Sequence, residues 1–326
     1  MTKQSREIDW YKDKRVGGLA RFAAAITILN IFGHSYLGFE QAFVHPFVAL
    51  LSTYFTDFIL EILDAKHTGR PYKFSGGWQK MVLFFLPAHI SGMAISMLLY
   101  PNSRLIVLAF AGSLAMASKH IFRVLINNKE RHVFNPSNLG ITITLLLFPW
   151  VGIAPPYQFT EYLYGVWDWL LPALIIFSGS FLNFKFTNRL PLVLTWIGTF
   201  FCQAIFRAWL FDTSAVAALG PMTGLAFLLF TFYMVTDPPT TPSSTRNQVI
   251  FGFSVALGYF IFMSFHVVFG LFYSLALVGL IRGFYIASSN YILSKKTGKS
   301  ILNITDVDVY KNVKAPVYTE SGVVSA

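Results

Sequence analysis

Two long hydrophobic segments are separated by the sequence RHVFNPSNLGI, residues 131–141. The Asn135-Pro136 pair within it suits a simple bilayer-crossing helix poorly, because proline removes a backbone donor and biases the preceding residue away from the helical conformation. Non-helical backbone at membrane depth is tolerated only where it is buried in protein or lines a cavity. The stretch, which we call the first junction, therefore predicts an interrupted helix beside a cavity.

A second interruption has the sequence TDPPTTP, residues 236–242, and also lies between two apolar segments. We call it the second junction. Paired interruptions of transmembrane helices are the usual pointer to a binding site in membrane transport proteins. We therefore expect a site between the two junctions.

The composition indicates an integral membrane protein. Hydrophobic residues make up 55% of the 326-residue chain, charged residues only 12%, and the mean hydropathy is +0.56. Soluble domains usually have about 25% charged residues. The lone Cys202 excludes an intramolecular disulfide and any multi-cysteine metal or iron–sulfur site.

The hydrophobic pattern predicts an all-α fold of about ten transmembrane helices. A helix needs about 20 mostly apolar residues to cross a bilayer. The predicted spans are residues 17–37, 43–63, 80–100, 104–122, 136–154, 164–183, 190–211, 215–235, 248–266 and 268–289. They define a transmembrane domain at 17–290, preceded by a cytoplasmic segment at 1–16 and followed by a cytoplasmic tail at 291–326.

The basic residues predict the orientation. With the N-terminus in the cytoplasm, all 25 Lys and Arg residues except Arg104 and Arg207 fall at cytoplasmic ends of spans, as the positive-inside rule requires. Both termini are then cytoplasmic, and the protein is a multi-pass protein of the cell (inner) membrane. Topology also accounts for the net charge of +10, so the expected partner is the lipid bilayer and not nucleic acid.

Three segments, residues 118–123, 131–140 and 230–246, resemble one family. It is the family of flavin-carrying membrane proteins common to the sodium-pumping NADH:quinone reductase and the Rnf electron-transport complex. The chain is most similar to a short, single-gene branch that includes proteins encoded in enediyne biosynthesis clusters. The resemblance implies a pseudo-symmetric ten-helix bundle similar to ammonium and urea channels, a flavin in the membrane, and electron transfer coupled to cation movement in partnership with other redox subunits.

Two features depart from the family pattern. The junctions follow predicted spans 4 and 8, whereas a five-plus-five repeat places them after 4 and 9. The larger family members bind FMN covalently through a threonine in a Ser-Gly-Ala-Thr-like stretch after the Asn-Pro helix, and residues 151–163 contain no such stretch. We therefore expect no covalent FMN, while non-covalent FMN, riboflavin or quinone stays open and ion pumping is in question.

The junctions supply the candidate cofactor-binding residues. Asn-Pro and Asp-Pro pairs can simply cap helices, with the side chain accepting a backbone N–H and proline in the first helical position. The functional interpretation uses the same exposed N–H groups and helix dipole to bind an anionic or carbonyl-rich ligand. The candidates are Asn135, Pro136, Ser137, Asn138, Thr236, Asp237, Pro238, Thr240 and Thr241.

Three ionisable residues within spans are candidates for an ion or proton path. Asp57 and Glu61 are four residues apart on one helix face, where like charges repel. They could share a proton or bind a cation, but we expect solvated side chains near the interface. His89 lies mid-span and could relay a proton, or it could be hydrogen-bonded within the bundle. The sequence indicates no catalytic residue and no metal site.

Three interpretations of the function follow. The preferred hypothesis is a membrane protein of redox-linked electron transport, at most the membrane subunit of an oxidoreductase or translocase, that binds a flavin or quinone between the junctions. The alternative is a transporter or channel for a small solute such as riboflavin or a biosynthetic product. A scaffold subunit without a ligand of its own is a third, weaker interpretation.

Overall fold

A computed structural model describes residues 14–126 and 129–297 of the chain. Helices dominate it, and the described strands form only two short antiparallel pairs. The α-helices are α1 (Lys14–Phe32), α2 (Val44–Thr68), α3 (Trp78–Leu98), α4 (Leu105–Ile121), α5 (Pro136–Leu147), α6 (Trp167–Leu182), α7 (Leu190–Leu210), α8 (Ala215–Leu219), α9 (Leu225–Leu229), α10 (Thr245–Ser264) and α11 (Gly270–Thr297). The predicted terminal segments 1–16 and 291–326 fall largely outside the described residues.

The described residues contain seven helices that are long and apolar enough to cross a membrane. The bent pair Ala215–Thr223 and Leu225–Met234, with a 65° angle between its parts, raises the number to eight if it is one span. The protein is therefore a helical membrane protein, and the finer count of ten stays a prediction. Helices α4 and α5 fall short, at 17 and 12 residues.

Helix α5 is shorter than the predicted span 136–154 because proline stops it. Its C-cap residue is Phe148 and the next residue is Pro149, which disfavours a helical conformation at the residue before it. Twelve residues rise only about 18 Å at about 1.5 Å per residue. That length is little more than half of a hydrocarbon core of about 30 Å.

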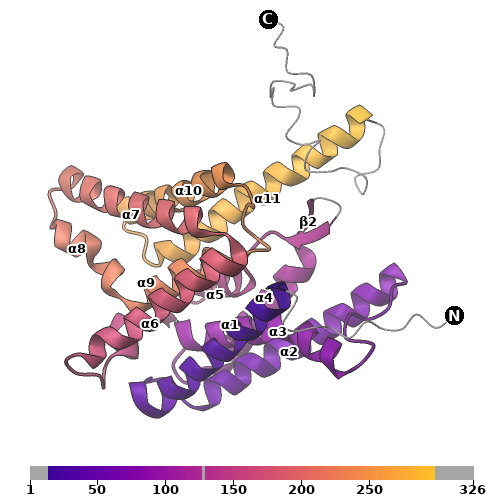
Figure 1. Ribbon diagram of the computed structural model, residues 1–326, viewed down its shortest axis with the longest axis horizontal. Coiled ribbons are helices and arrows are strands. Elements are labelled where there is room, and N and C mark those ends of the chain that lie inside the picture. The colour runs from indigo at the N-terminus through magenta and orange to yellow at the C-terminus, as the bar shows by residue number, and fades with distance from the viewer. Residues whose placement is uncertain (1–13, 127–128, 298–326) are drawn as a thin grey trace, which may run out of the picture.

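The helices pack in two groups. Figure 1 shows α1 to α4 on one side of the molecule and α7, α10 and α11 on the other, with α5 and α6 between them. Helix α5 contacts both α4 and α11, so it joins the groups. The first junction, at the start of α5, therefore lies where the two groups meet.

The same local structure ends α1 and α6. A π-helical turn follows each, η1 (Gly33–Leu37) and η3 (Asn183–Thr187), and a left-handed residue follows each turn. These residues are Gly38, with φ 82°, and Asn188, with φ 53°, and both residue types tolerate positive φ. This repeated ending is a feature that two related halves would share.

An aromatic core positions the approach to the second junction. Trp196 of α7 is fully buried, and its indole N–H donates to Thr231 Oγ1 at 2.9 Å. Phe200 and Phe230 pack against the same indole ring. Thr231 and Phe230 belong to η5 (Phe230–Met234), the π-helical turn that leads directly into the second junction. The indole hydrogen bond therefore holds that turn against α7.

A β-hairpin leads into the first junction. Strand β2 (Arg123–Ile126) pairs antiparallel with β3 (Lys129–His132), with Arg123 opposite His132. Asn290 near the end of α11 donates to the Leu125 carbonyl at 3.0 Å. The hairpin is thus held against α11, and it delivers the chain to Asn135.

The contact between α4 and α5 depends on Gly140. A Cβ added there would lie 2.5 Å from the Ala111 carbonyl oxygen and 3.1 Å from Ala115 Cβ, so the two backbones approach as closely as a glycine allows. We expect Gly140→Ala to destabilise the protein by about 1–3 kcal/mol, because overpacking forces the helices apart. Gly198→Ala on α7 is the control, since no atom lies within 4 Å of its added Cβ. Thermal unfolding in detergent measures both variants, and equal stability would contradict the tight α4–α5 contact.

Candidate functional site: a cavity between the two junctions

Asn135 caps helix α5. Its Oδ1 accepts hydrogen bonds from the backbone N–H of Asn138 at 3.1 Å and from Ser137 Oγ at 2.8 Å. Pro136 occupies the first helical position, where the missing N–H costs nothing. The first junction is therefore a helix N-terminus, as its sequence predicts.

The second junction is a turn and not a helix start. The Asp237 carboxylate accepts from Thr240 Oγ1 at 2.9 Å, and its backbone carbonyl accepts from the Thr241 N–H at 3.1 Å. Helix α10 begins only at Thr245. Pro239 and Pro242 lack N–H groups and bias the residues before them away from helix. The expectation of a helix N-terminus at Asp237 is thus wrong.

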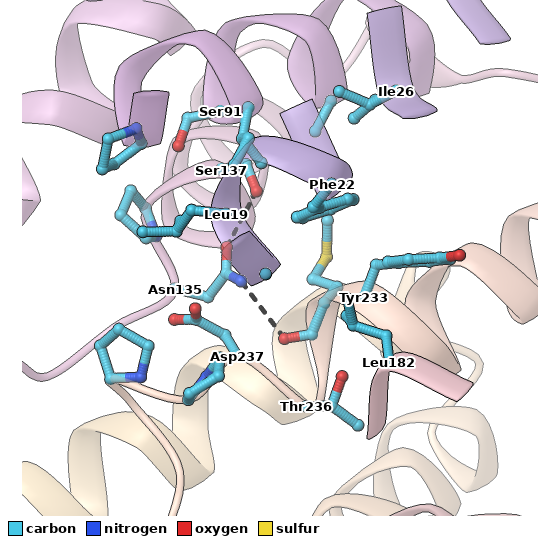
Figure 2. A pocket seen from close by; sticks show the side chains of 18 of the residues that line it. Leu19, Phe22, Ile26, Ser91, Asn135, Ser137, Leu182, Tyr233, Thr236 and Asp237 are labelled. Atoms are coloured by element: carbon cyan, nitrogen blue, oxygen red, sulfur yellow. Dashed lines mark hydrogen bonds between the residues drawn. The ribbon is translucent and has the colours of Figure 1, made fainter. Parts of the chain in front are cut away.

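The two junctions meet directly. Asn135 Nδ2 donates to the carbonyl of Met234 at 3.2 Å, one of the dashed contacts that Asn135 makes in Figure 2. His132 at the end of β3 places its Nε2 3.7 Å from Asp237 Oδ2. Residues that are far apart in sequence therefore form one polar wall, where Figure 2 shows Asn135, Ser137, Thr236 and Asp237 together.

This wall belongs to a cavity of about 1640 Å³. Ligand sites commonly have volumes of about 300–1,000 Å³, so a three-ring cofactor would fit. Six of the nine junction candidates line the cavity: Asn135, Pro136, Ser137, Thr236, Asp237 and Pro238. The other three, Asn138, Thr240 and Thr241, do not.

The three remaining candidates have structural contacts. Asn138 is buried on α5, and its Nδ2 donates to the Phe272 carbonyl of α11 at 3.1 Å. Thr240 and Thr241 bond to Asp237 and shape the turn. None of these three residues lines the cavity, because the rotation of α5 about its axis and the fold of the turn direct them elsewhere. Their positions therefore do not support their assignment as ligand contacts.

Aromatic and hydroxyl groups form a second wall. Phe22 of α1 and Tyr233 of η5 stack at 4.8 Å between ring centroids with 16° between their planes. Tyr233 Oη lies 2.8 Å from Ser178 Oγ of α6. All three line the cavity, and sequence reasoning missed them because nothing distinguishes them from the many other aromatic and small residues of the spans.

Arg189, also missed, ties the second junction to the start of α7. The residue is only 5% exposed, and its Nε donates to Thr241 Oγ1 at 2.8 Å. Burial lowers the pKa of this guanidinium to about 10, the positive charges of Arg131 and Arg282 add to the decrease, and the negative charge of Asp237 opposes it. The group therefore remains charged at neutral pH.

Asp57 and Glu61 are not solvated at an interface, contrary to the expectation for them. Both are fully buried. Asp57 accepts from Lys119 Nζ at 2.9 Å and from His120 Nε2 at 2.7 Å. Glu61 pairs with Arg70, and Lys73 Nζ lies at 3.1 Å. Basic groups thus occupy the oxygens that a transported cation would need.

His89 is hydrogen-bonded within the helix bundle, which is the second of the two interpretations given for it. One ring nitrogen lies 2.7 Å from Thr27 Oγ1 and the other 2.6 Å from Tyr54 Oη. These contacts join α1, α2 and α3, and His89 does not line the cavity. Its position favours a helix-linking role over a proton relay.

The comparisons with known proteins assign no family. The sequence matches no protein-family model and no curated protein. The function must therefore be argued from the cavity itself.

Proposed function

We propose that the protein is a membrane component of redox-linked electron transport that binds a flavin or quinone non-covalently in the cavity between the two junctions. The observation that carries this proposal is the direct contact of the junctions, Asn135 Nδ2 to the Met234 carbonyl, at the wall of one large cavity. The junction sequences are also those that resemble the flavin-carrying membrane proteins of the sodium-pumping and Rnf complexes.

The cavity chemistry suits a planar, carbonyl-rich ring. The stacked Phe22 and Tyr233 offer an aromatic surface, and aromatic rings favour offset stacking. Asn135 Nδ2 has a second N–H beyond the one donated to Met234. Asp237 retains carboxylate lone pairs beyond its bond to Thr240. Together these groups could hydrogen-bond the polar edge of an isoalloxazine or quinone ring.

The remaining details are part of the proposal. The distribution of basic residues supports a cavity mouth on the cytoplasmic side of the cell (inner) membrane, with both termini on that side. Helices α4 and α5 and the bent pair would complete ten spans, arranged as two related halves. Electrons would reach the bound ring from other redox subunits, which would also perform any NADH oxidation, and cation movement coupled to this step is part of the same hypothesis.

A transporter is the second candidate, and the discontinuous helices favour it. The second part of the bent pair, Leu225–Met234, and the start of the half-length α5 both contribute residues to the cavity wall. Secondary transporters place their substrates at broken helices of this kind. The cargo would then be a small solute such as riboflavin or a biosynthetic product.

The test is a visible absorption and fluorescence spectrum of the protein purified in mild detergent, recorded before and after acid precipitation. We expect a flavin band that moves to the supernatant and that is reduced and reoxidised while bound. A band retained in the pellet would show covalent flavin. A protein with no chromophore that also fails to bind added flavin or quinone would contradict the redox proposal and favour the transporter.

A further inference from the structure

The cavity lining is strongly basic, and we call the part formed by its Lys and Arg residues the basic end. Two carboxylates, Glu130 and Asp237, line it, against seven Lys or Arg residues: Lys73, Lys80, Lys119, Arg123, Lys129, Arg131 and Arg189. Acidic residues of α2 neutralise three of the seven, through pairs of Lys73 with Glu61, Lys119 with Asp57 and Arg123 with Asp64. Most of the remaining positive charge has no such partner within the described residues.

Arg189 is the decisive member, because it is buried without a counter-ion. Its guanidinium bonds only neutral oxygens, those of Thr187, Pro238 and Thr241. Within the described residues, no carboxylate oxygen lies within 4.0 Å of it. Buried charges are ordinarily paired, because an uncompensated charge in a low-dielectric site is costly.

Arg131 adds a second guanidinium to the same end of the cavity. In the part of the chain that the structure describes, its side chain makes no hydrogen bond or ion pair, and it lies close enough to Arg189 to disfavour the charge there. Asp237 is the acid whose charge acts on Arg189, and its carboxylate already accepts from Thr240 and faces His132. The positive-inside rule accounts for exposed cytoplasmic basic residues, but not for a buried arginine such as Arg189.

We infer that the cavity binds an organic anion whose phosphate group is held by Arg131 and Arg189 at the basic end, with its apolar or aromatic body against Phe22 and Tyr233. The planar guanidinium of Arg131 matches phosphate oxygens in bidentate geometry. Arg189 adds the one N–H that its Nη1 retains beyond the bond to the Thr187 carbonyl. This inference rests on the proposed function and narrows its ligand to FMN, since riboflavin and quinones carry no phosphate. The same phosphate ester chemistry occurs in anionic phospholipids, which are the other possible source.

FMN and riboflavin give a matched test, because they differ only in the phosphate. Each is titrated into the full-length protein in detergent, with quenching of flavin fluorescence as the readout. We expect FMN to bind at least about tenfold more tightly than riboflavin, as expected for hydrogen bonds between charged groups. Arg131→Gln should abolish that preference and leave riboflavin affinity unchanged. Arg189→Lys should reduce the preference for FMN. This variant keeps the positive charge beside the second junction but loses the planar guanidinium.

Lys66→Gln is the control, since Lys66 is an exposed basic residue of α2 that does not line the cavity. It should keep the full FMN preference. Equal binding of FMN and riboflavin to the wild-type protein would overturn the inference and leave the flavin site standing. An FMN preference that persists in Arg131→Gln would overturn the assignment to this residue.

If neither flavin binds, the proposed flavin site fails and a lipid comparison decides the inference. Thermal unfolding is measured in micelles containing phosphatidylglycerol or phosphatidylcholine. Stabilisation specific to phosphatidylglycerol that disappears in Arg131→Gln but not in Lys66→Gln would support a phosphate site filled by lipid. Identical behaviour of all three proteins would overturn it.

Discussion

Replacing Asp57 with asparagine is expected to destabilise the helix bundle by about 3 kcal/mol, because breaking a buried ion pair leaves an uncompensated charge. The carboxylate is fully buried and holds both Lys119 Nζ, at 2.9 Å, and His120 Nε2, at 2.7 Å. Its loss would strand the Lys119 ammonium, which is only 19% exposed. Reversible unfolding in mixed micelles, followed by tryptophan fluorescence, measures the change.

Glu40→Gln is the control for loss of a carboxylate, because Glu40 is exposed and accepts a hydrogen bond from Tyr100 at 3.1 Å. It should change stability by no more than about 0.5 kcal/mol. The double variant Asp57→Asn/Lys119→Met should recover part of the loss, since replacing both partners removes the stranded charge. If Asp57→Asn is as stable as Glu40→Gln, the ion pairs of α2 do not hold the bundle, and a role for Asp57 in an ion path would return.

The pairing of Asp57 shows where sequence reasoning reached its limit. Its spacing from Glu61 placed both residues on one face of α2, but the sequence could not show which helix that face meets. The partner, Lys119, lies on α4 and is brought there only by tertiary packing. A buried carboxylate with a distant partner and a solvated one look alike in a single sequence.

The junctions were predictable because their chemistry is local. An asparagine before a proline specifies a cap within four residues, and Asn135 forms it. The turn at Asp237 was only half predictable, since an Asp-Pro pair can begin either a helix or a turn. Which neighbours face the cavity depends on the rotation of α5 around its axis, so Ser137 lines it while Asn138 contacts α11.

Arg189 could not be recognised from the sequence for a related reason. It follows a span and precedes Leu190, a position at which the positive-inside rule predicts a solvated basic residue. Its burial arises because the second junction, some fifty residues later in the chain, folds back over it through Thr241 and Pro238. Long-range contacts of this kind give the basic end of the cavity its unpaired charge.

Asn135→Ala and Asp237→Ala are each expected to weaken ligand binding by at least about tenfold while leaving membrane insertion intact. Asn135 both caps α5 and joins it to the Met234 carbonyl, so alanine would separate the two walls of the cavity. The cap alone is worth about 1 kcal/mol, which a multi-span protein tolerates. Hydrogen bonds to charged groups contribute about 1.5–3 kcal/mol each, so loss of the Asp237 carboxylate should weaken binding by at least about tenfold. Flavin fluorescence titration, with gel filtration to confirm folding, measures both.

Two further variants separate the roles of Asn135. Asn135→Asp keeps the acceptor that caps α5 but cannot donate to the Met234 carbonyl, so it should retain the helix and still weaken binding. Asn138→Ala is the matched control, because Asn138 is also a junction asparagine but bonds the Phe272 carbonyl away from the cavity. It should lower thermal stability and keep affinity. If Asn135→Ala and Asp237→Ala both bind the ligand as tightly as Asn138→Ala does, the contact between the junctions has no effect on binding. The junctions would then serve only as a cap and a turn, and the ligand would lie elsewhere in the cavity.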